Sequence, residues 1–185
     1  MPQHRSLDAL AQRIEPKATW DDLALPPREI ARLREIAGAI RQRRAVGPTP
    51  AGPGTGILLS GGTAAAKAQV AEALARDLGL GLFRVDLSTV VSKFIGETEK
   101  NLGRVFDAAQ GSGAILFFDE ADALFDKRTE VKDSHDRFAH IELDYVLQRI
   151  EALDGIAILA IKSTTRPSRA VLRRLKVVRF PTKRS

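Results

Sequence analysis

Short apolar runs alternate along most of the chain with segments in which apolar residues recur every three or four positions. Such runs are typical of strands in a parallel sheet that helices cover on both faces, and the longer periodic segments predict those helices. The alternation therefore predicts an α/β fold with a five-stranded parallel sheet between two helical layers. The predicted strands are residues 56–60, 82–87, 114–119, 157–161 and 177–180, and the predicted helices are residues 67–78, 97–110, 136–153 and 168–175.

The first 54 residues have a different pattern from the remainder. Residues 1–19 are weakly periodic and are interpreted as an extension, and a proline pair then predicts the start of a helix with one apolar face. The proline- and glycine-rich residues 47–54 predict a linker. We therefore expect an N-terminal part at residues 1–54 and an α/β core at residues 55–185 that ends in a basic tail.

The stretch from Ser60 to Ala68 lies between a predicted strand and a predicted helix, where a G-x-x-x-x-G-K-[ST] phosphate loop belongs. Gly61 and Lys67 match this pattern, but Ala66 replaces the second glycine and Ala68 replaces the hydroxyl residue that binds Mg²⁺. A strand–turn–helix with a solvated lysine also fits this stretch taken alone. The residues predicted to bind the phosphates of a nucleotide are Gly61, Gly62, Thr63, Ala64, Ala65, Ala66, Lys67 and Ala68.

Two adjacent carboxylates, Asp119 and Glu120, end another apolar strand. In phosphoryl transfer, the first carboxylate would hold the ligand shell of a metal, and the second would orient and deprotonate the attacking water. The alternative is a strand end with a solvated face. Because the pair follows a candidate phosphate-loop lysine, the catalytic interpretation is favoured over that alternative.

The combined motifs of residues 15–181 resemble those of AAA-type ATPases. The sequence ILFFDEADAL, which begins at Ile115, is similar to the Walker B segment, and SKFIGETEKNL, which begins at Ser92, is similar to the first pore loop and its following helix. Lys162 stands where the family has the sensor-1 asparagine, and LRRL, which begins at Leu172, resembles the arginine-finger segment. Within the family, the chain is most similar to the bacterial ATPases that accompany contractile phage-tail-like systems.

The resemblance implies a P-loop NTPase-like fold that uses ATP and Mg²⁺, with Asp119 holding the metal through water and Glu120 acting as the base. It also implies a homo- or hetero-oligomeric ring that remodels or threads protein, in which Arg173 or Arg174 reaches the γ-phosphate of a neighbouring subunit. The residues that would grip the polypeptide in the central channel are Lys93, Phe94, Ile95 and Gly96. Without the resemblance, Phe94 could equally pack on the core at the edge of the sheet.

The chain departs from the family pattern at positions that carry chemistry. Ala64, Ala66 and Ala68 stand in the phosphate loop, and Lys162 offers only donors and charge where an asparagine amide would position water. Lys162 could also pair with Glu120 or Asp119 and neutralise it. From the sequence up to Ser185 we expect a fold that lacks the C-terminal helical lid usual in the family. Because one lost electrostatic donor commonly costs about 3 kcal/mol of transition-state stabilisation, we predict weak ATP binding with impaired or absent hydrolysis.

The net charge of +6 is carried by the C-terminal tail, which has no acidic residue from position 160 onward. A solvated or subunit-facing tail is the favoured interpretation, and nucleic-acid binding through residues 162–184 is the less favoured one. A nucleotide-independent structural or interaction subunit is the other alternative function. The sequence has no cysteine, no apolar run long enough to span a bilayer and no signal-peptide core at its start, so we expect a cytoplasmic protein without disulfides.

Overall fold

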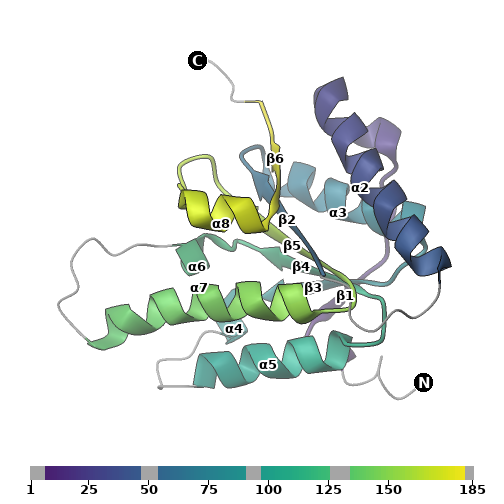
Figure 1. Ribbon diagram of the computed structural model, residues 1–185. Helices are drawn as coiled ribbons and strands as arrows, with labels where there is room; N and C mark the ends of the chain where they lie inside the picture. The colour runs from purple at the N-terminus through teal and green to yellow at the C-terminus, as the bar shows by residue number, and fades with distance from the viewer. Residues whose placement is uncertain (1–6, 47–53, 91–96, 126–133, 182–185) are drawn as a thin grey trace.

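A six-stranded sheet forms the centre of the fold, with helices on both faces (Figure 1). The computed structural model describes residues 7–46, 54–90, 97–125 and 134–181. The strand order is β1-β3-β4-β5-β2-β6, and all pairs are parallel except β1 with β3. The strands are β1 (Gln12–Ile14), β2 (Thr55–Ser60), β3 (Leu82–Asp86), β4 (Ile115–Asp119), β5 (Ile156–Ile161) and β6 (Lys176–Arg179).

Each central strand contributes alternate residues to two separate hydrophobic clusters. In β2, Leu58 packs in the cluster with α5 (Glu97–Ala109) and α7 (Ser134–Ala152), whereas Ile57 and Leu59 pack in the cluster with the helices of the other face. Those helices are α2 (Pro27–Ala45) and α3 (Ala64–Leu78). Burial on both faces explains why the central strands are nearly continuous apolar runs. The α/β fold and its parallel order are thus confirmed.

All five predicted strands are present, but the prediction of a five-stranded sheet missed β1. This short strand lies within the segment interpreted as an extension and pairs antiparallel with β3, with Gln12 opposite Arg84 and Ile14 opposite Leu82. Its three residues are exposed or only partly buried, so no apolar alternation marks it in the sequence. The edge of β3 supplies the partner that orders it, and Leu7 just before it is fully buried.

The remaining elements are short helices: η1 (Trp20–Asp22), α4 (Leu87–Val90), α6 (Asp122–Phe125) and α8 (Arg169–Arg174). In the part of the chain that the structure describes, no helix combines the length and apolarity that a membrane span requires.

Candidate active site

The candidate residues meet at one edge of the sheet, where the parallel strands β2, β4 and β5 end. The phosphate loop follows β2, Asp119 and Glu120 lie at the end of β4, and Lys162 follows β5, which lies between the other two strands. Because parallel strands end on the same side, the sheet brings together motifs that are far apart in sequence.

The loop after β2 requires glycine at two positions. Gly61 has a φ of 84° and Gly62 has a φ of 67°, in the left-handed region that disfavours other residues. A Cβ on Gly62 would also lie 2.8 Å from the ring of Phe180, whose backbone N–H donates to the Ser60 carbonyl at 2.9 Å. The residue after β6 therefore packs directly on the loop and leaves no space there for a larger side chain.

Helix α3 begins at Ala64, three residues before the predicted start at Lys67. Thr63 caps it: the hydroxyl accepts a hydrogen bond from the Ala66 N–H at 3.0 Å, and the carbonyl accepts one from the Lys67 N–H at 3.1 Å. Alanine has the highest helix propensity, so alanines in place of loop residues favour this early start. Two backbone N–H groups that the pattern assigns to phosphate are therefore engaged within the helix's first turn.

The Lys67 side chain is buried, with 5% of its surface exposed, so the alternative of a solvated lysine is wrong. Its Nζ donates to the carbonyl of Ile161 at the end of β5, at 2.8 Å. Burial lowers the pKa of Lys67, while Asp122 and Asp119 oppose the shift and Lys162 reinforces it. Lys67 thus lies beside the acidic end of β4 but is held by a backbone oxygen.

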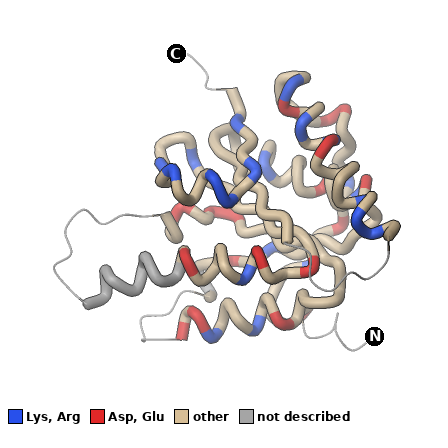
Figure 2. The backbone as a smooth tube through the Cα atoms, in the orientation of Figure 1, with Lys and Arg blue, Asp and Glu red and all other residues tan. Residues whose placement is uncertain are grey.

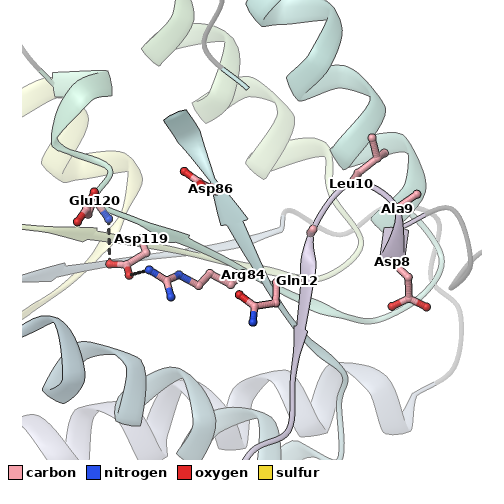
Figure 3. Close-up of a pocket in the computed structure, with 9 residues that line it drawn as sticks. Asp8, Ala9, Leu10, Gln12, Arg84, Asp86, Asp119 and Glu120 are labelled. Atoms are coloured by element: carbon pink, nitrogen blue, oxygen red, sulfur yellow. Dashed lines mark hydrogen bonds and ion pairs between the residues drawn. The ribbon is translucent and has the colours of Figure 1, made fainter. Parts of the chain in front are cut away.

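Asp119 is held by two groups, one at each carboxylate oxygen (Figure 3). Its Oδ2 accepts from Nη2 of Arg84 on β3 at 2.6 Å, and its Oδ1 accepts from the Glu120 backbone N–H at 2.9 Å. Only 11% of the Asp119 side chain is exposed. Glu120 is exposed and has a φ of 54°, an uncommon conformation for a residue other than glycine. Such strained positions are frequent at functional sites.

Asp122 fixes the loop that follows β5, a role that no motif in the sequence predicts. Its Oδ1 accepts from the Lys162 backbone N–H at 2.8 Å and from the Thr165 hydroxyl at 2.5 Å. The Lys162 side chain is exposed, and among the described residues it forms no ion pair with Asp119 or Glu120. The suggested neutralisation of these carboxylates by Lys162 is therefore absent from this structure.

The two candidate arginine fingers differ in their surroundings. Arg174 is held within its own chain, with Nε 2.6 Å from Oε1 of Glu151 and Nη1 3.0 Å from Oδ1 of Asp144, whereas Arg173 is exposed on α8. Lysine and arginine positions mark α8 and β6 in Figure 2. The candidate channel residues Lys93, Phe94, Ile95 and Gly96 lie outside the described residues.

A pocket of about 540 Å³ lies beside Asp119, on the side of the sheet edge away from the phosphate loop. Its walls come from the residues before and within β1 and from the ends of β3 and β4 (Figure 3). No sequence pattern predicts this pocket, because β1, which forms one of its walls, has no apolar alternation. Its lining residues are Asp8, Ala9, Leu10, Ala11, Gln12, Arg84, Asp86, Asp119 and Glu120.

The residues present do not fit the expected Mg²⁺ site. Ala68 has no oxygen to offer, and each oxygen of Asp119 already accepts a hydrogen bond or ion pair. Within the described ranges, no group of three or more metal-binding side chains is placed to hold a metal ion. The chain thus retains the acidic pair Asp119 and Glu120 but lacks the other oxygen ligands that Mg²⁺ requires.

The family model described as "ATPase family associated with various cellular activities (AAA)" matches residues 57–182. Among curated proteins, the chain is 30% identical to Protein SAV of Sulfolobus acidocaldarius over 82% of this chain and 20% of that protein. It is 36% identical to an uncharacterized AAA family ATPase, y4kL, of Sinorhizobium fredii over 61% of this chain and 34% of that one. The chain therefore spans about a fifth to a third of these relatives.

Two solved structures of the FIGL-1 AAA domain have similar folds. The first has a TM-score of 0.70 at 21% identity, covering 97% of this chain and 60% of that chain. The second, described as a complex with ADP, has a TM-score of 0.66 at 20% identity, covering 97% of this chain and 62% of that chain. At these identities the likeness concerns the fold.

Proposed function

The chain belongs to the AAA family of ATPases, and from that premise we propose that it is a nucleotide-binding domain with weak ATP binding and impaired or absent hydrolysis. One observation carries this proposal: both charged groups that would handle phosphate and metal are engaged inside the chain. Lys67 donates to the Ile161 carbonyl, and Asp119 pairs with Arg84. The family uses ATP and Mg²⁺, and both must compete with these internal bonds.

The expected weakness of ATP binding follows from Lys67. A phosphate can still approach the N-terminus of α3, where the helix dipole favours negative charge. The Ile161 carbonyl takes one of the three N–H donors of Lys67 and holds its ammonium group at the end of β5. A hydrogen bond of a charged group contributes about 1.5–3 kcal/mol, so a phosphate that turns the ammonium away from the carbonyl binds roughly ten- to a hundredfold more weakly than one that meets a free lysine. The site in this proposal comprises residues 61–68 with Asp119, Glu120 and Lys162.

The expected loss of hydrolysis follows from the surroundings of Glu120. This residue is exposed and is the candidate base, but Ala68 offers no hydroxyl and Asp119 is paired with Arg84. Removing single preorganised electrostatic groups commonly costs a hundredfold or more in rate. Two such changes at one site therefore predict turnover close to background.

AAA domains assemble into rings, and we place this chain in a cytoplasmic ring that remodels or threads protein, as the resemblance to the phage-tail-associated subgroup suggests. In such a ring the exposed Arg173, rather than Arg174, is the better candidate to reach a neighbour's phosphate, because Arg174 is held by Glu151 and Asp144. Lys93, Phe94, Ile95 and Gly96 are the proposed polypeptide contacts.

Calorimetric titration with ATP tests the proposal. We expect Ala66→Gly/Ala68→Thr to bind Mg-ATP about tenfold more tightly than the wild type, because it restores the loop glycine and the hydroxyl. Ala65→Gly is the matched control, since it places a glycine in the same helical turn outside the pattern. Robust wild-type turnover that Glu120→Gln abolishes would contradict the proposal.

A nucleotide-independent interaction subunit is the second candidate, favoured by the same internal bonds of Lys67 and Asp119. A ligand that binds only the native state must raise the melting temperature. A wild-type melting temperature that millimolar Mg-ATP leaves unchanged would favour this second function.

A further inference from the structure

Arg84 lies in the middle of β3, on the same face of the sheet as Asp86 and Asp119. In the parallel register of β3 and β4, Arg84 is opposite Phe117 and Asp86 is opposite Asp119. Side chains two residues apart on a strand share a face, so Arg84 and Asp86 both lie beside the end of β4. Figure 3 shows the Arg84 side chain extending along the sheet to Asp119.

Three acidic residues lie at the ends of β3 and β4, near Arg84. Asp86 and Asp119 are register partners on adjacent strands, which lie about 4.8 Å apart, and Glu120 follows directly. All three carboxylates line the pocket that Arg84 also lines. Among the residues that line this pocket, Arg84 is the one with a cationic side chain. Its guanidinium contacts Asp119, whose side chain is less exposed than that of Arg84.

The ion pair is positioned to compete with a divalent cation. Arg84 lies 2.6 Å from Oδ2 of Asp119, and 45% of the Arg84 side chain and 11% of the Asp119 side chain are exposed. The pair is therefore more shielded from water than an ordinary surface pair. Mg²⁺ dehydrates reluctantly and needs several well-placed oxygen ligands, and Ala68 supplies none to compensate for displacing Arg84.

We propose that Arg84 excludes divalent cations from Asp119 and takes over the charge neutralisation that a metal would provide there. Arg84 is a positioning residue: it acts on Asp119 and not on a reacting atom. It follows that ATP binding by this chain does not depend on Mg²⁺. This consequence rests on the function proposed above. Replacing Arg84 with a neutral residue should let a divalent cation approach Asp119.

The first test uses Mn²⁺ alone, with the free ion measured by electron paramagnetic resonance. We expect Arg84→Gln to bind Mn²⁺ at least about fivefold more tightly than the wild type, the ratio that corresponds to an ion pair worth about 1 kcal/mol. Adding Asp119→Asn to Arg84→Gln should remove the gain. The matched control is Arg41→Gln, which breaks the more exposed 2.7 Å ion pair between α2 and α3 and should leave Mn²⁺ affinity within about twofold.

Equal Mn²⁺ affinity in the wild type and a folded Arg84→Gln would overturn the proposal. If Arg84→Gln does not fold, the comparison of the wild type with Asp119→Asn decides. The proposal expects Mn²⁺ affinity to be the same in both, and a loss of Mn²⁺ binding in Asp119→Asn would show that Asp119 already holds the cation.

The second test measures ATP binding by calorimetry in Mg²⁺ and in excess chelator. We expect the wild-type dissociation constant to agree within about twofold between the two conditions, and Arg84→Gln to bind at least about fivefold more tightly with Mg²⁺. A wild type that requires Mg²⁺ overturns the proposal. If no variant binds ATP, the proposed function fails, while the Mn²⁺ experiment still decides the role of Arg84.

Discussion

The phosphate-loop end of β2 and the acidic end of β4 lie at the same edge of the sheet, but their charges are compensated differently. Lys67 donates a hydrogen bond to a backbone carbonyl, that of Ile161, whereas Asp119 is paired with a full opposite charge, that of Arg84. A carbonyl is a neutral partner, so an anionic phosphate can replace it with a gain in electrostatic energy. The arginine that pairs with Asp119 can be replaced only by another cation. A ligand is therefore harder to bind at the acidic end of β4 than at the phosphate loop.

The two ends also differ in how they are held. The loop after β2 depends on backbone conformation and on the packing of Phe180, whereas the end of β4 depends on one side chain from the adjacent strand. Substitutions in the loop should therefore affect folding most, and substitutions at Arg84 should affect both folding and ion binding.

The largest effect is expected from Gly62→Ala. The substitution places a Cβ 2.8 Å from the Phe180 ring at a φ of 67°, so both a clash and backbone strain oppose folding. We expect a loss of about 3 kcal/mol in the free energy of unfolding, measured by denaturant titration. Gly79→Ala is the control, since Gly79 has a φ of 65° with open space around it and should lose only about 1 kcal/mol. Equal losses for Gly62→Ala and Gly79→Ala would show that the Phe180 ring moves to accommodate the added Cβ.

The next effect concerns the acidic end. Arg84→Gln leaves Asp119, a mostly buried carboxylate, without its counter-charge and next to Asp86. We expect a loss of about 2 kcal/mol in the free energy of unfolding, below the value for breaking a fully buried pair. Arg41→Gln, which breaks the more exposed pair with Asp77, should lose less than about 1 kcal/mol. A loss for Arg84→Gln that is no larger than the loss for Arg41→Gln would contradict the stronger contribution expected of the shielded pair.

The early start of α3 is tested by Thr63→Ala. The hydroxyl cap on the Ala66 N–H disappears, and an N-cap of this kind contributes about 1 kcal/mol to the free energy of unfolding. Ser168→Ala, which removes the longer cap of α8 at 3.3 Å, is the comparison and should lose less. Thermal melting measures both, and a Thr63→Ala variant as stable as the wild type would contradict the role of this cap.

The smallest effect is the pH dependence contributed by Lys67. Its pKa is lower in the folded protein than the ordinary value of 10.5, so between the two values the unfolded state binds more protons. Stability should therefore rise as the pH increases through that interval, and Lys67→Met should lack this rise. Denaturant titrations of both proteins up to about pH 10.5 measure the difference. Parallel stability curves for the two proteins would contradict the lowered pKa.

The strand pattern and the main motifs could be predicted because both are local. Two-sided burial makes the central strands continuous apolar runs, and Lys67 and Asp119 each follow such a run at the expected place. The start of α3 was predicted three residues late, although the alanines from Ala64 onward favour an earlier start. The helix propensity of these alanines indicates the earlier start, but the phosphate-loop pattern assigns the same residues to a loop.

Arg84 was missed for a different reason. A charged residue within a strand gives no indication of its partner, because the partner is set by which strand lies next to it and in which register. The alternation of Arg84 and Asp86 shows that one face of β3 is polar at this end, but only the pairing of β3 with β4 places Asp119 there. The pocket wall formed by β1 depends in the same way on the open edge of β3.

The sequence by itself determined the α/β architecture, the positions of its parallel strands and the residues of the phosphate-loop and acidic motifs, because periodicity and local spacing encode them. The tertiary structure alone decided the bonding partners of those residues: Ile161 for Lys67, Arg84 for Asp119, and Glu151 and Asp144 for Arg174. Such partners come from other strands and helices. They are set by register and packing, which no local pattern specifies.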